Sequence, residues 1–189
     1  DVNSVKVAGN LYDSDGTLIV EDGESIQDAI DRAGEFENVH TVKVKPGTYE
    51  EDLTVDVKDL TLRGVVEKDS GDNQLWSETD YEDPFPEYEY ATIQGNTIEI
   101  EADGVTVEGF VIDNEGGERA IGPGDSDGTT IRYNKIMNSK RAIQGDWHGR
   151  PTNLDIIGNL LDTDYGVAGT EGVEDLTIVD NTFKTSVEG

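Results

Sequence analysis

A short motif recurs along this chain at a nearly constant spacing. Arg-Ala-Ile at residues 119–121 returns 22 residues later at 141–143, and the related Tyr-Gly-Val follows 24 residues further on at 165–167. Self-similarity at a period of about 20–50 residues is the sequence signature of repeat architectures, in which each unit packs only on its neighbours. The period therefore predicts a repeat architecture.

A second signature recurs in the same frame. The runs 129–137, 154–162 and 176–184 alternate polar and apolar residues and place an asparagine at the same position, which Phe110 takes in the related run 105–113. Alternation of this kind predicts a strand with one buried face. Three such strands per repeat predict a coil of parallel strands, stacked on the next coil about 4.8 Å away.

Two sets of equivalent residues are expected to stack along such a solenoid. An asparagine at a bend tolerates left-handed backbone geometry and satisfies backbone groups that the turn leaves unpaired. An asparagine ladder is therefore predicted at one corner, and an aliphatic ladder inside the coils. The predicted members are Asn134, Asn159 and Asn181 for the first ladder, and Ile121, Ile143 and Val167 for the second.

One amphipathic helix is predicted, over residues 25–34. Ser25 is its expected N-cap, and Asp28 stands where the acid of a capping box would lie. A helix at this place would cover the open end of the first coil, which is read from the strand, turn and strand pattern of residues 40–55. Its apolar face consists of Ile26, Ala29, Ile30 and Ala33.

The runs SIQDAIDRA (25–33), TVKVKPGTYEEDLTV (41–55) and LTLRG (60–64) resemble the N-terminal signature of the pectate-lyase-like superfamily, and the later repeats resemble its carbohydrate-binding and sugar-hydrolase repeats. The resemblance extends over about residues 25–66 and 91–184. It implies an all-β fold, a right-handed single-stranded parallel β-helix, formed here by one domain over residues 1–189. We expect the chain to be a mature protein or an excised part of a longer one. The superfamily holds enzymes, adhesins and viral spikes, so fold alone specifies no activity.

Residues 67–90 interrupt the repeat. The stretch is rich in acids and aromatic residues, among them Trp76 and Tyr81, and is predicted to be a long loop that leaves one coil. Long loops on a rigid scaffold often carry function. Two interpretations stay open: the rings bind a ligand, or an acidic flap packs them on the wall of the solenoid.

The charge of the chain excludes several classes of partner. There are 42 acidic against 14 basic residues, a net charge of −28, so nucleic acid and anionic membranes would be repelled. No apolar run has the length of a membrane span, and the absence of cysteine excludes disulfides. Because the acids are scattered along the whole chain, we expect an acidic surface of the halophilic kind, on a protein that is extracellular or at the cell surface.

Lyases of the superfamily remove a proton beside a uronate carboxylate, with an Arg or Lys as base and Ca²⁺ held by acidic side chains. The resemblance makes Arg119 and Arg141 candidate catalytic residues, because they occupy equivalent positions one coil apart. Asp125, Asp127 and Asp146 are the candidate Ca²⁺ ligands, since Ca²⁺ takes oxygen ligands. The alternative is that the arginines neutralise nearby acids at the bends.

The loop GDWHGRP (145–151) is a candidate for sugar binding. Its Trp147 would stack on a sugar ring while His148 and Arg150 bond the hydroxyls. Trp76 and Tyr81 of the 67–90 stretch are further candidate carbohydrate-binding residues. The alternative for Trp147 is that it covers an apolar edge of the solenoid.

These observations favour a non-catalytic β-helix module that is structural, polysaccharide-recognising or both. The first alternative is a Ca²⁺-dependent polysaccharide lyase or epimerase acting on uronate glycans. The second is a subunit of a surface layer, filament or viral spike, because the sequence shows no cap after the last strand and an open coil exposes strand edges through which copies would associate.

Overall fold

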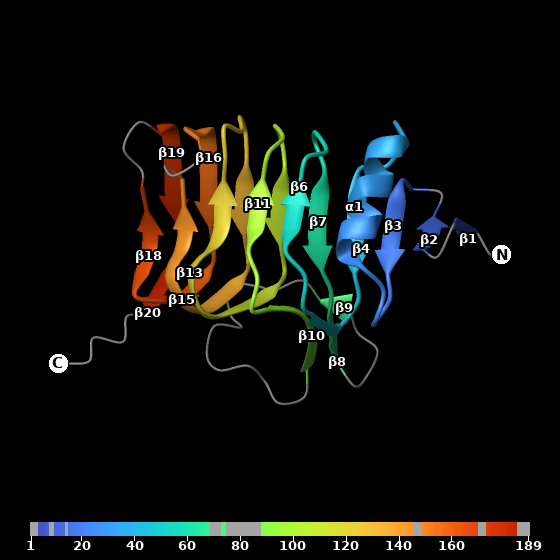
Figure 1. The fold of residues 1–189 in the computed structure, drawn as a ribbon, viewed down its shortest axis with the longest axis horizontal. Helices are drawn as coiled ribbons and strands as arrows, with labels where there is room; N and C mark the ends of the chain where they lie inside the picture. Colours follow the sequence, from blue (N-terminus) through green and yellow to red (C-terminus); the bar gives the residue numbers. More distant parts are fainter. Residues whose placement is uncertain are drawn as a thin grey trace.

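The chain folds as a parallel β-solenoid of about six turns with one short helix near its N-terminus (Figure 1). The computed structural model describes residues 4–7, 10–13, 15–68, 73–74, 88–145, 149–169 and 173–184. The predicted parallel solenoid is confirmed. Within the described part of the chain, no helix has the length and apolar character needed to cross a membrane.

A complete coil contributes one strand to each of three faces, whereas β3 and the β19–β20 coil at the two ends are incomplete among the described residues. The first face is formed by β3 (Thr17–Val20), β4 (Thr41–Val44), β7 (Thr61–Gly64), β12 (Thr106–Glu108), β14 (Thr130–Arg132), β16 (Thr152–Ile157) and β19 (Glu174–Val179). The second is formed by β5 (Gly47–Tyr49), β10 (Tyr88–Gln94), the first halves of β13 (Val111–Pro123) and β15 (Lys135–Gln144), β17 (Leu160–Asp162) and β20 (Thr182–Lys184). The third is formed by β6 (Leu53–Val55), β11 (Ile98–Ile100), the second halves of β13 and β15, and β18 (Tyr165–Ala168).

Alternate residues of these strands point inward and fill the coils. The predicted aliphatic ladder is in register, because Ile121 pairs with Ile143 and Ile143 with Val167. Ile98 and Leu53 continue the same column toward the N-terminus. Four side chains of this column are buried: Leu53, Ile98, Ile121 and Ile143. Val167, the fifth, is partly buried and packs against the core.

The asparagine ladder is present at the corner that follows the first face. Asn159 is fully buried, and its Oδ1 accepts from the backbone N–H of Asn134 at 3.0 Å and from its side-chain Nδ2 at 3.1 Å. Asn181 repeats both contacts with Asn159, at 2.8 and 3.0 Å. One coil toward the N-terminus, Asn134 Oδ1 accepts from the backbone N–H of Phe110, so the ladder ends where the phenylalanine stands.

The N-terminal end of the solenoid is covered by α1 (Ile26–Glu35), whose predicted apolar face is buried against the first coil (Figure 1). The predicted N-cap Ser25 accepts from Asp28 N. The acid that completes the cap is Glu51, not Asp28: its carboxylate accepts from the backbone N–H of Ile26 at 2.6 Å and from Ser25 Oγ at 2.8 Å. The antiparallel strands β1 (Ser4–Val7) and β2 (Asn10–Asp13) extend the first face beyond β3.

We expect Glu51→Gln to lower the free energy of unfolding by about 1–2 kcal/mol, because the helix N-terminus loses a negatively charged acceptor. Urea denaturation measures the change. Glu50→Gln is the matched control, since Glu50 is the exposed neighbour in the same turn. Equal losses for both variants would show that the effect comes from surface charge and not from the cap.

The insertion between β7 and β10 begins and ends as antiparallel structure. β8 (Val66–Lys68) pairs with the start of β10 and with the two-residue strand β9 (Asn73–Gln74). Trp76 and Tyr81 lie outside the described residues.

At the other end of the solenoid, the coil of β19 and β20 exposes Ile178, Val179 and Phe183.

Candidate functional site

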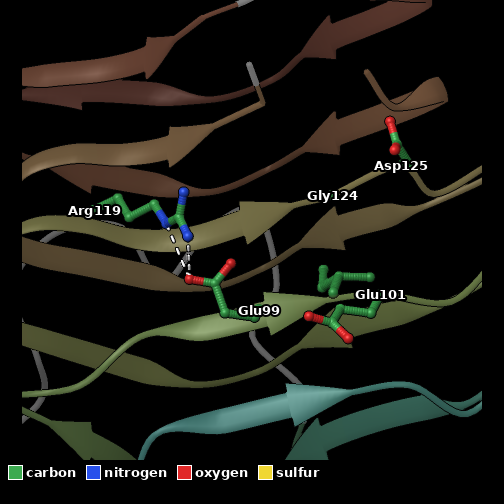
Figure 2. Close-up of a pocket in the computed structure, with 6 residues that line it drawn as sticks. Glu99, Glu101, Arg119, Gly124 and Asp125 are labelled. Atoms are coloured by element: carbon green, nitrogen blue, oxygen red, sulfur yellow. Dashed lines mark hydrogen bonds and ion pairs between the residues drawn. The ribbon is translucent and has the colours of Figure 1, made fainter. Parts of the chain in front are cut away.

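The two candidate arginines lie side by side but have different partners. Arg119 and Arg141 are paired in register on β13 and β15. Arg119 forms an ion pair with Glu99 of β11, with its Nε 3.1 Å from Glu99 Oε1 (Figure 2). Arg141 Nη1 lies 3.0 Å from Glu118 Oε2. The arginines are therefore equivalent in the repeat and distinct in chemical environment.

Glu118 is shared between two cations. A hydrogen bond from Lys140, aided by one from Arg141, holds the pKa of the Glu118 carboxyl below its ordinary value. This cluster is exposed on the surface, where an ion pair contributes little to stability. It matches the interpretation that an arginine at a bend neutralises nearby acids.

Arg119, in contrast, lines a groove of about 590 Å³ on the third face. Figure 2 shows its ion pair with Glu99 on one side of the groove, and Glu101 and Asp125 toward the other. Gly122 makes room for the ion pair, because a Cβ at this position would lie 2.5 Å from Glu99 Oε2 and 2.9 Å from Arg119 Nε. The groove thus combines a guanidinium with three carboxylates.

Two described residues of the predicted sugar-binding loop, Gly149 and Arg150, contact the end of this groove. Asp125 Oδ1 accepts from the backbone N–H of Arg150 at 2.7 Å. Gly149 packs directly on Gly124 and Asp125, so closely that a Cβ on it would lie 2.2 Å from Asp125 N. The structure therefore brings Arg119, Asp125 and Arg150 into one region. Asp146, Trp147 and His148 lie outside the described residues.

Asp127 belongs to a turn and is not among the residues that line the groove. Its Oδ1 accepts from Thr152 Oγ1 and Asn153 Nδ2, each at 2.6 Å, and these bonds hold the pKa of the Asp127 carboxyl below its ordinary value. Its backbone N–H donates to Asp103 Oδ1 at 3.0 Å. Of the two candidate Ca²⁺ ligands that the structure describes, Asp125 lines the groove and Asp127 does not. Among the described residues, no three acids or histidines are arranged to hold a metal ion.

Glu99 and Glu101 were not singled out from the sequence. They belong to the alternating run TIEIEADG, which reads as an ordinary strand with a charged outer face. The strand register would have identified Glu99. When Ile98 is aligned with Ile121, Glu99 lies beside Gly122, within reach of Arg119.

Comparison of this chain with protein-family models, with curated proteins and with solved structures found no match.

Proposed function

We propose that this chain is a non-catalytic β-solenoid module that recognises a polysaccharide in the groove beside Arg119. The observation that carries the proposal is the groove itself, where Arg119, Glu99, Glu101 and Asp125 surround about 590 Å³. We further propose a pectate-lyase-like origin, and a place at the outside of a salt-adapted cell.

The size and the lining of the groove suit a sugar. Ligand sites commonly enclose about 300–1,000 Å³. Sugar hydroxyls both donate and accept hydrogen bonds, and the groove offers carboxylate acceptors together with a guanidinium donor. Three carboxylates against one arginine favour a neutral glycan over a uronate, because like charges close together repel.

The ion pair of Arg119 supports binding over catalysis. A guanidinium is protonated at all ordinary pH values, and that of Arg119 is ion-paired with the Glu99 carboxylate. The lyases that the chain resembles use an Arg or Lys as base, whereas the Arg119 guanidinium is engaged in an ion pair with a carboxylate. Arg119 is better suited to donate hydrogen bonds to a bound sugar.

A glycan array in molar salt tests the proposal. We expect the protein to bind a neutral polysaccharide, and Arg119→Gln to weaken that binding about tenfold, which is the loss of one hydrogen bond from a charged donor. Arg141→Gln is the matched control, because Arg141 occupies the equivalent position one strand away and does not line the groove.

The same experiment separates the alternatives. Equal loss of binding in both variants would show that the groove is not the site. Release of an unsaturated uronate from an acidic glycan, seen as ultraviolet absorbance and abolished by Arg119→Gln, would overturn the non-catalytic assignment in favour of a lyase.

A further inference from the structure

We propose that the outer surface of the first face is a second binding site, specific for an acidic polysaccharide. The site is the basic strip, defined as the outward residues Lys43, Arg63 and Arg132 of β4, β7 and β14, with Glu108 of β12 between the two arginines. Its ligand chemistry is a carboxylate or sulfate on a sugar polymer. The strip lies on a different face from the groove beside Arg119, so neither proposal depends on the other.

The register of the strands aligns these cations in one row. Lys43 pairs with Arg63, Arg63 with Glu108, and Glu108 with Arg132. Adjacent strands lie about 4.8 Å apart, so the row offers a cation at the first, second and fourth of four evenly spaced positions. Only 14 basic residues are present in the whole chain, and three of them stand in this row.

The one acid in the row does not oppose an anionic ligand. The Glu108 side chain is 1% exposed, and each of its carboxylate oxygens contacts a different arginine. Arg132 Nε lies 2.6 Å from Oε2, and Arg63 Nε contacts Oε1. The arginine side chains remain 37% and 40% exposed, so the buried carboxylate positions two guanidiniums whose outer parts meet solvent.

Lys43 differs from the two arginines of the strip in its ion pairing. It alternates with the buried residues Val42 and Val44, which places its side chain on the outer surface. Among the residues that the structure describes, it forms no ion pair. Its charge is therefore available to a ligand.

A row of hydroxyls runs parallel to the basic strip. Thr41, Thr61, Thr106 and Thr130 pair in register on the same four strands, two residues before the members of the strip. A hydroxyl donates one hydrogen bond and accepts two, which suits the hydroxyls of a sugar chain. Arginine binds carboxylate and sulfate-like groups with two parallel hydrogen bonds. The two rows together match a polymer that alternates anionic groups and hydroxyls.

The net charge of the chain does not prevent this contact at moderate salt. At about 0.15 M ionic strength the screening length is about 8 Å, so the charges at the contact outweigh the acids on the other faces. The row of hydroxyls is interrupted on β16 by Asp155, and the row of cations gives way there to Ile157. On β3 the cation row gives way to Ile19. The site therefore covers four strands, β4, β7, β12 and β14.

Isothermal titration with polygalacturonate, dextran sulfate and uncharged dextran at 0.15 M salt tests the inference. We expect binding to one or both anionic polymers and none to dextran, with weaker binding as salt rises. Lys43→Gln should weaken binding about threefold and Lys43→Glu about tenfold, in line with the energy of exposed ion pairs. Lys135→Gln is the matched control, because Lys135 lies on β15 of the second face.

The polymers separate carboxylate from sulfate recognition. No binding to either anionic polymer, or equal losses for the Lys43 and Lys135 variants, would overturn the inference. Loss of binding with Arg119→Gln and not with Lys43→Glu would assign the anionic ligand to the groove instead. The neutral glycan of the proposed function should bind the Lys43 variants normally, so the two proposals fail independently.

Discussion

Replacing Asn159 by alanine should lower the free energy of unfolding by about 3 kcal/mol or more, since each buried polar group left unpaired costs about 1–3 kcal/mol. The side chain is buried at the centre of the ladder. Its removal leaves the backbone N–H of Asn134 without its acceptor, and Asn134 Nδ2 keeps only its bond to Val107 O. It also removes the donor that bonds Ile131 O at 2.9 Å. Urea denaturation followed by far-ultraviolet circular dichroism would measure the loss.

Asn181→Ala is the control for this experiment. Asn181 makes the same two contacts with its neighbour, but it lies in the last coil and is partly exposed, so water can replace the lost bonds. We expect a loss of about 1 kcal/mol, the usual net value of a hydrogen bond. If Asn159→Ala cost no more than Asn181→Ala, the ladder would not be the stabilising element that its burial indicates.

Gly109→Ala should also destabilise the solenoid by about 3 kcal/mol, from backbone strain and a clash together. Gly109 has a φ of +79°, a region that side chains rarely adopt, and a Cβ on it would lie 2.5 Å from Gly64 O. The clash is with backbone of the adjacent coil and cannot be relieved by a side-chain rotation. The midpoint of thermal unfolding would report the change.

Gly23→Ala separates the two causes. Gly23 has the same φ of +79° but no atom within 4 Å of the position of a Cβ. The free energy of unfolding should fall only by the cost of the left-handed backbone conformation, about 1 kcal/mol. A similar loss for both glycines would show that the coils can move apart near Gly64, and that their close approach is not required.

The sequence predicted the fold because the solenoid repeats its side chains along with its backbone. Asn134 and Asn159 occur in the same frame and form the same contacts, so periodicity was sufficient to place them. The capping helix was recognised for a local reason, the spacing of its apolar residues. Its final acceptor was missed, because Glu51 lies 26 residues after Ser25 and no local pattern joins them.

The groove could be predicted only in part, because non-equivalent residues form it. Arg119 stood out through its repeat, whereas its partner Glu99 has no counterpart in the neighbouring coils. The equivalent position is Gly122 on β13. A pair of this kind depends on the strand register and on a side chain that reaches across a glycine, neither of which a single repeat unit encodes.

The stacking of coils also determines what an insertion costs in loop-closure entropy. Ladder contacts join residues 22 or 25 positions apart, but the contact between Arg63 and Glu108 joins residues 45 apart, because residues 67–90 lie between them. A doubling of loop length costs only about 0.6 kcal/mol. A solenoid of this kind can therefore carry a long loop at almost no cost in loop-closure free energy, provided that the strands on either side of the loop pair in register with the adjacent coils.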